Sequence, residues 1–371
     1  MRYSGKNQAH ALTLVYERDR LVRVEAGPDL LPDDVDWLRA RIASDLLGPE
    51  RKKIARDIVF SSLPVDSALR IDDLVQLLPA PPEAARPPFL MGDHPLVMEF
   101  PFYTSQTVWT NVARRARGAH ELALLLNVLF HGGMRQLGQG YHNWSFVPDT
   151  RNEADLGVRY LQQGYLIPGF IGEQDDFTSI ESIRPMALVR GQEYFERLGI
   201  SPGMSLDCAD WTPDLVRVFF RLDEARRRLF SRATFWYDQA RRARSPSSAF
   251  VATVSAIETL APRDTTSARC EACDRSLAKG PTQRFIDFLE DIVPDQARSR
   301  AARKRLYWRR SRLAHGEALF LRDEELTVAL HPQTNSEWRE SGYAIGLAGA
   351  VFINWLMRVG SPPSPAKTIG G

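Results

Sequence analysis

The chain has 371 residues, of which 44% are hydrophobic and 25% are charged, so it has the composition of a packed globular protein rather than a disordered one. Its net charge of +2 does not indicate a class of binding partner. The basic residues are mostly arginines, since only six of the 48 are lysines. Arginine suits two-point contacts with phosphate or carboxylate, but a GC-rich coding sequence would produce the same bias.

Cysteine content and hydropathy indicate the compartment. Three cysteines cannot form a paired disulfide framework, and the polar N-terminus lacks the apolar run of a signal peptide. Tyr343–Met357 is uncharged over 15 residues and contains Asn354, whereas a membrane-spanning helix needs about 20 apolar residues. We therefore expect a buried helix here and a cytoplasmic protein without a membrane segment.

The first 209 residues predict an α+β domain of unknown role. No Walker loop, dinucleotide-binding glycine pattern or metalloprotease motif occurs in the chain. The elements expected in chain order are a strand or hairpin, an amphipathic helix, a proline-rich loop, a buried strand and a helix: Leu12–Val24, Asp33–Leu47, Pro79–Pro88, His94–Tyr103 and Val112–Phe130.

Residues 210–360 predict a helical bundle, followed by a flexible tail at 361–371. Apolar residues recur at helical spacing, and Ser245 and Gly280 each precede a proline that favours the first helical position. Short connections between helices are typical of a bundle. The helices expected are Pro213–Arg242, one from Ser245 to Ala261, one starting at Gly280, one from Asp295 to Gly316, and Tyr343–Met357.

The densest charge feature is Arg298–Arg312, which holds eight basic residues and no acidic one. Such a run is ordinarily a solvated helix face. The functional alternative is an RNA-binding face formed by Arg303, Arg305, Arg309 and Arg312, because cations that neutralise phosphates give salt-dependent binding.

One arginine of this run does not fit a solvated face. On a helix with 100° per residue, Arg310 lies about 40° from Leu306, inside the apolar stripe. Glu258 lies inside the apolar stripe of the helix that starts after Ser245. Because an unpaired buried charge is costly, we expect a buried Glu258–Arg310 pair, and removal of one partner should cost about 3–5 kcal/mol. A purely architectural salt bridge would satisfy the same pattern.

Two segments resemble the HEPN superfamily, in its Apea-like branch. The string from Leu306 to Gly316 resembles the branch pattern Leu-Tyr-x-x-Arg-Ser, three residues, His-Gly, and Ser255–Leu260 resembles the first core helix with its glutamate. The resemblance covers the C-terminal half only. Similar segments between them are Gly280-Pro281-Thr282, Arg284-Phe285 and Phe288-Leu289-Glu290.

The resemblance implies a fold, a partner and an activity. The expected fold is mainly α, with a HEPN-like bundle that forms a homodimer and an α+β domain before it. Many members are metal-independent endoribonucleases of toxin–antitoxin or phage-defence systems, so RNA and an antitoxin or defence protein are the implied partners. In such a site His315 would act as general acid or base, Arg310 would hold the phosphate with Glu258 beside it, and Ser311 would orient the ring or the substrate.

Two alternatives stay open. Active members often carry Asn, Asp or His after the arginine where this chain has Ser311, so a non-catalytic HEPN module that binds RNA or nucleotide is the second hypothesis. Cys270 and Cys273 have the spacing of half a zinc site, but a closed site needs two further ligands. No cofactor is therefore expected, and a packed pair of cysteines is preferred to zinc.

Overall fold

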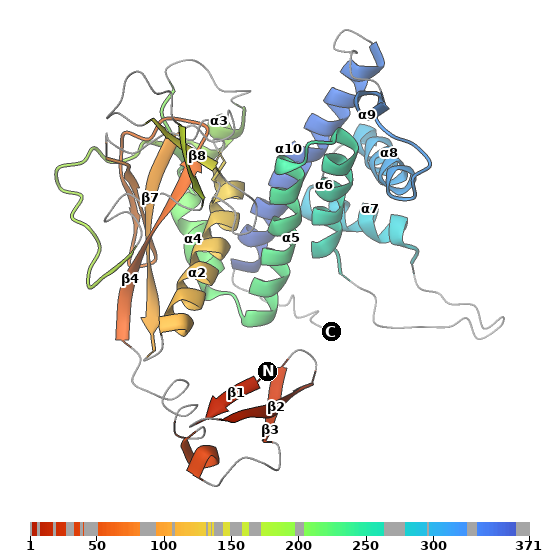
Figure 1. Ribbon diagram of the computed structural model, residues 1–371. Helices are drawn as coiled ribbons and strands as arrows, with labels where there is room; N and C mark the ends of the chain where they lie inside the picture. The colour runs from red at the N-terminus through yellow and green to blue at the C-terminus, as the bar shows by residue number, and fades with distance from the viewer. Residues whose placement is uncertain are drawn as a thin grey trace, which may run out of the picture.

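In the computed structural model, β-strands dominate the first part of the chain and helices the second (Figure 1). The residues described with their side chains lie within 33–37, 51–81, 94–105, 108–130, 172–194, 204–262, 279–294, 300–324 and 332–360, together with 40, 133, 134 and 136. The backbone is also described at residues 2–5, 8–17, 20–26, 144–148, 158–162, 195–196 and 297–299.

A five-stranded antiparallel sheet, in the order β10-β4-β7-β6-β5, is the largest β-structure described. Its central strands β4 and β7 pair over their full length, from Arg51 opposite Thr104 to Ser61 opposite His94. The bounds of the sheet strands are β4 Arg51–Ser61, β5 Leu69–Ile71, β6 Val75–Pro79, β7 His94–Thr104 and β10 Gly172–Gln174.

The smaller β-elements form three separate sheets. The predicted hairpin is confirmed, since β2 and β3 pair antiparallel, and β1 pairs with β2. Their bounds are β1 Arg2–Gly5, β2 Gln8–Glu17, β3 Arg20–Ala26, β8 Trp144–Pro148, β9 Val158–Gln162, β11 Leu188–Val189 and β12 Cys208–Ala209.

Helix α2, Val108–Leu129, covers one face of the five-stranded sheet (Figure 1). Leu96, Met98 and Phe100 of β7 face the helix, because alternate side chains of a strand lie on the same face. Gly118 explains how the helix comes so close: a Cβ at this position would lie 2.8 Å from the Phe100 ring.

The helical part stacks beyond α2, with α5 and α10 packed against it and α6 packed on α5 (Figure 1). One continuous apolar core runs from the sheet through α2 into these helices. The helix bounds are α3 Gly191–Glu196, α4 Thr212–Arg221, α5 Glu224–Arg242, α6 Pro246–Leu260, α7 Pro281–Ile292, α8 Ala297–Ala314, α9 Leu321–Glu324 and α10 Pro332–Gly360.

The coarse fold prediction is confirmed, whereas one predicted helix is wrong. The chain is mostly helical, with an antiparallel sheet in its N-terminal part. The single helix expected over Pro213–Arg242 is two helices, α4 and α5. The chain turns at Leu222, and the Asp223 side chain caps α5 by accepting a hydrogen bond from the Arg226 amide at 2.8 Å.

The apolar helix expected near the C-terminus is the second half of α10. By length and composition α10 is the one described helix that could cross a membrane. Leu347, Val351 and Phe352 of this helix are buried in the core. Asn354 donates to the Ile292 carbonyl at 3.1 Å, which satisfies the polar group in this apolar run.

Several predictions concern residues outside the described part of the chain. These are most of the Asp33–Leu47 helix, most of the Pro79–Pro88 loop, Cys270, Cys273 and the tail at 361–371. Of the Asp33–Leu47 helix, residues 33–37 and 40 are described and are helical.

Candidate functional site

Helix α6 carries Glu258 to the edge of the bundle. Ser245 caps the helix by accepting from the Ser248 amide at 3.1 Å, and Pro246 occupies its first turn. Phe250, Val254 and Ile257 bury one face. Because Glu258 lies in the last turn, its carboxylate reaches the space between α6 and the neighbouring α7 and α8.

Helix α8 presents Arg310 from its buried stripe. Leu306, Tyr307 and Leu313 are all buried, and the Tyr307 ring packs on Phe285 of α7 with 5.1 Å between centroids. Arg310 lies one turn after Leu306 and Tyr307, with its guanidinium carbon 6.0 Å from the centroid of the Tyr307 ring. The apolar contacts therefore fix the direction in which the Arg310 side chain leaves the helix.

Glu258 and Arg310 form the predicted ion pair, with 2.9 Å between Oε2 and Nη2. The expectation that the pair is buried is wrong: the side chains retain 24% and 26% of their accessible surface. Glu258 lies two residues before the end of α6, at the rim of the apolar stripe rather than in its middle. The helical wheel fixed the directions of the two side chains but not how far neighbouring chain covers them.

Tyr307 is the third member of this group. Burial raises the pKa of the Tyr307 hydroxyl, and the Glu258 charge and a hydrogen bond to Glu258 raise it further, while Arg310 and Arg284 oppose the shift. The hydroxyl therefore keeps its proton and donates it to the carboxylate. Glu258, Tyr307 and Arg310 thus join α6 to α8 through hydrogen bonds as well as apolar packing.

His315 occupies the C-terminal cap of α8. Gly316 follows with a φ of +72°, its amide donates to the Leu313 carbonyl at 3.2 Å, and the Glu317 amide donates to Arg312 at 2.9 Å. This is the Schellman arrangement that ends a helix on glycine. The His315 side chain is exposed, and none of the described residues hydrogen-bonds its ring.

Ser311 does not orient the His315 ring among the contacts described. Its carbonyl accepts from the His315 amide at 3.0 Å, which is the ordinary helical bond, and its side chain is half-buried. An orienting role for Ser311 stays a prediction for the substrate-bound protein.

Two members of the predicted RNA-binding face are corrected by the structure. Arg303 is 1% exposed and donates to the Val293 carbonyl at 2.5 Å, so it joins α8 to the end of α7 and cannot meet RNA. Arg309 pairs with the buried Glu337 of α10 at 3.1 Å and lies over the Phe320 ring, so its guanidinium is already engaged within the protein.

The other two members remain at the surface. Arg305 is exposed. Arg312 lies over the ring of Trp308 at 4.8 Å, and 56% of Trp308 is exposed. An exposed aromatic ring beside a guanidinium is the combination on which single-stranded bases stack. Of the predicted RNA-binding face, Arg305 and Arg312 therefore remain, with Trp308 and Lys304 exposed on the same helix.

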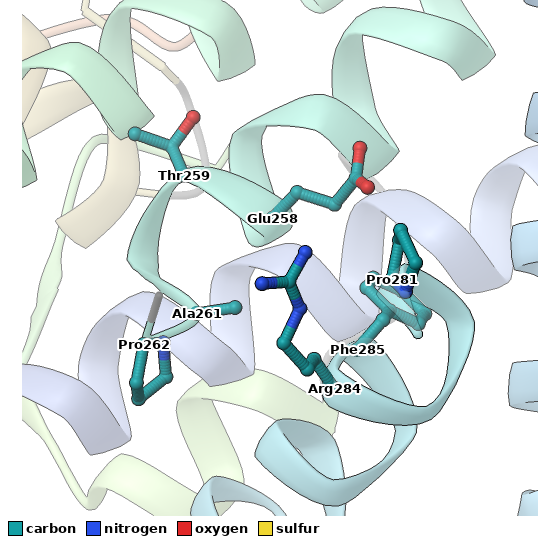
Figure 2. A pocket seen from close by; sticks show the side chains of 7 residues that line it. All are labelled: Glu258, Thr259, Ala261, Pro262, Pro281, Arg284 and Phe285. Atoms are coloured by element: carbon teal, nitrogen blue, oxygen red, sulfur yellow. The ribbon is translucent and has the colours of Figure 1, made fainter. Parts of the chain in front are cut away.

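A pocket of about 240 Å³ is lined by Glu258, the partner of Arg310 (Figure 2). It opens between the end of α6 and the start of α7, with the Arg284 side chain extending into it toward Glu258. The residues that line it are Glu258, Thr259, Ala261, Pro262, Pro281, Arg284 and Phe285.

Sequence reasoning placed Arg303 on the RNA-binding face instead of in the core, and it gave Arg284 no role in a site. Arg303 lies about 60° from Leu306 on the same wheel that located Arg310, so the stripe itself carried the signal. No comparable signal marked Arg284, because the pocket arises where two helix ends meet. Within the described ranges, no three His, Cys, Asp or Glu side chains are grouped as metal ligands; Cys270 and Cys273 lie outside those ranges.

The chain was compared with protein families, curated proteins and solved structures. No family model, curated protein or solved structure matches the chain. The function is therefore inferred from the residues and their geometry.

Proposed function

We propose that this protein is a metal-independent endoribonuclease of the HEPN type, which acts in the cytoplasm as a homodimer. The observation that carries the proposal is the placement of Arg310 and His315. Glu258 and Tyr307 hold the Arg310 side chain at the rim of the bundle, and the helix that carries it ends in the exposed His315. A fixed cation and a solvent-accessible imidazole are the two groups that RNA cleavage without metal requires.

The chemistry uses the 2′-hydroxyl of RNA as the nucleophile. The 2′-oxygen forms a bond to the adjacent phosphorus, and the bond from phosphorus to the 5′-oxygen breaks. His315 accepts the 2′-proton as a base, and the resulting imidazolium donates a proton to the leaving 5′-oxygen. Imidazole exchanges protons readily near neutral pH. Arg310 stabilises the charge that develops on the phosphate oxygens.

Arg310 retains donors for this task while Glu258 holds it. Glu258 occupies Nη2, whereas a guanidinium carries five N–H donors in a planar fork. About a quarter of the Arg310 side chain is exposed while the ion pair with Glu258 is intact. We infer that a phosphate oxygen approaches this exposed part without displacing the carboxylate.

The first test is cleavage of mixed cellular RNA in EDTA by purified wild-type protein, Arg310→Ala and His315→Ala. We expect cleavage by the wild type only, with products that end in a 2′,3′-cyclic phosphate or its hydrolysis product. Arg232→Ala, which removes an exposed charge on α5, is the matched control and should cleave normally. Cleavage that persists in both site variants, or that disappears with EDTA, would contradict the mechanism.

A specific observation supports a second candidate, a non-catalytic module that binds RNA or nucleotide through assembly. The Glu258 carboxylate neutralises much of the Arg310 charge in the unbound protein, which suits a structural role as well. RNA binding without cleavage in the same experiment would favour this candidate. In either case, we propose phage defence or a toxin–antitoxin pair as the biological setting.

A further inference from the structure

Among the described residues that line the pocket, Arg284 alone carries a charge opposite to that of Glu258 (Figure 2). Its guanidinium extends from the first turn of α7 into the pocket, and its side chain is half-buried. Arg300, Arg309 and Arg310 each pair with a carboxylate. Among the residues described, none forms an ion pair or side-chain hydrogen bond with the Arg284 guanidinium.

The charge of Arg284 reaches the same group of residues as Arg310. Both guanidinium groups lower the pKa of the Tyr307 hydroxyl, against the larger effect of burial and that of Glu258. Two cations therefore stand near one carboxylate. Glu258 pairs with Arg310, so the charge of Arg284 is left to bind a phosphodiester group.

The size and walls of the pocket limit what it can hold. At about 240 Å³, it is smaller than the about 300–1,000 Å³ typical of sites that enclose a whole drug-sized ligand. A phosphate with part of its sugar fits this space better than a complete dinucleotide. Pro262, Pro281 and Phe285 give the pocket an apolar wall suited to the carbon face of a sugar.

We propose that this pocket binds the nucleotide next to the cleaved bond, and that Arg284 holds its phosphate while Arg310 holds the scissile one. Arg284 is thus a second phosphate-binding residue, supplied by a different helix. The identity of the ligand as RNA rests on the proposed function. The binding of a phosphodiester by Arg284 is tested separately from cleavage.

The experiment uses an RNA oligonucleotide that is 2′-O-methylated at every position and cannot be cleaved by 2′-oxygen attack. Its affinity for the full-length protein is measured by fluorescence anisotropy in EDTA at several salt concentrations. We expect Arg284→Gln to bind about tenfold more weakly, which corresponds to the loss of one charge-assisted contact. Arg284→Lys should recover part of the loss, because lysine keeps the charge but not the planar fork.

The salt dependence separates a phosphate contact from a structural effect. Each lost contact to a single strand should reduce the slope of log affinity against log salt by about 0.7. Arg284→Gln should show this change while its melting temperature stays that of the wild type. The control Arg232→Gln removes one exposed charge on α5 and should alter neither affinity nor slope.

Wild-type affinity and slope in Arg284→Gln, or no binding of the probe by the wild-type protein, would overturn the pocket assignment. Binding that depends on Arg284 in a protein that never cleaves RNA would keep the pocket and overturn the catalytic proposal. Cleavage by the wild type together with normal binding by Arg284→Gln would keep the catalytic proposal and overturn the pocket assignment.

Discussion

The Glu258 carboxylate accepts from Arg310 and Tyr307 at a position that is only partly covered by protein. Solvent screens such a pair, so it contributes less to stability than the fully buried pair that the helical spacing predicts. Partial exposure is also what makes Arg310 accessible to a phosphate. The same geometry therefore reduces what the pair contributes to stability and leaves Arg310 available to bind a ligand.

Glu258→Ala should lower the free energy of unfolding by about 1–3 kcal/mol, because Arg310 and Tyr307 lose their common acceptor at a half-buried site. Urea unfolding measures the change. Glu317→Ala is the matched control, since Glu317 pairs with Arg312 at 3.7 Å and is 62% exposed. The control should change stability by no more than about 0.5 kcal/mol. Equal losses in the two variants would show that Glu258 has no special structural role.

At the residue scale the sequence located the pair but misjudged the cations around it. Helical periodicity gives the direction of each side chain on α8, and it identifies Arg303 as well as Arg310 as inward. The prediction of one basic face failed because an 18-residue helix distributes eight cations around its whole circumference. Arg309, for example, pairs with Glu337 and Glu340 of a helix that follows later in the chain.

Gly316 determines how α8 ends and where His315 lies. A φ of +72° is unfavourable for a residue with a Cβ, and no heavy atom lies within 4 Å of the position that a Cβ would take. Gly316→Ala should therefore destabilise the protein by backbone strain alone, by about 1 kcal/mol. Urea unfolding measures this change, and cleavage should fall with it if His315 moves.

Gly342→Ala is the control for this prediction. Gly342 lies in α10 with open space around its Cβ position. Alanine in a helix interior is favoured over glycine by about 0.5–1 kcal/mol, so this variant should be more stable than the wild type. Opposite signs in the two variants are the expected result, and destabilisation by both would contradict the assignment to backbone conformation.

At the element scale the helices were predictable and most of the sheet was not. Caps and prolines mark the start of α6 and α7, and the apolar run of α10 is long. Strand β4 carries Arg56 and Asp57 among its apolar residues, so its alternation is hidden. The buried Glu99 of β7 is satisfied by Gln76, Gln174 and Thr178 from distant segments, a solution that no local pattern shows.

The core of the whole molecule crosses the boundary predicted at residues 209–210. Helix α2 contacts α5 through buried polar side chains, where Asn127 donates a hydrogen bond to Asp238 at 3.2 Å. Arg241 donates to Asn127, and Arg242 pairs with Asp238 at 2.8 Å. Sheet and bundle thus share both apolar contacts and a hydrogen-bonded network, and the division into two domains stays a prediction.

Asp238→Ala should lower the stability of the sheet and of the helical bundle together. Removing the buried carboxylate leaves the Asn127 side-chain nitrogen and Arg242 without the acceptor that they share, at a cost of about 3 kcal/mol. We expect one unfolding transition, shifted to lower denaturant, by both circular dichroism and tryptophan fluorescence. Two separate transitions, only one of them shifted, would show that the sheet and the bundle unfold independently.

The proposed reaction requires a homodimer. Arg310 and His315 diverge by about 140° on one helix, so one subunit cannot easily direct both at a single phosphate. A twofold axis is the commonest symmetry of assembly, and it would place Arg310 of one subunit opposite His315 of the other. Each site would then contain one residue from each chain.

This arrangement predicts complementation between two inactive variants. Arg310→Ala and His315→Ala each remove one residue from every site in a homodimer, so each alone should be inactive. When the two are unfolded, mixed in equal amounts and refolded together, half of the dimers are mixed, and each mixed dimer has one complete site. Activity per chain should return to about a quarter of the wild-type value. Mixing folded variants under conditions where subunits do not exchange is the control. No recovery after refolding would place Arg310 and His315 of the same subunit in one site, or show that the sites do not act in pairs.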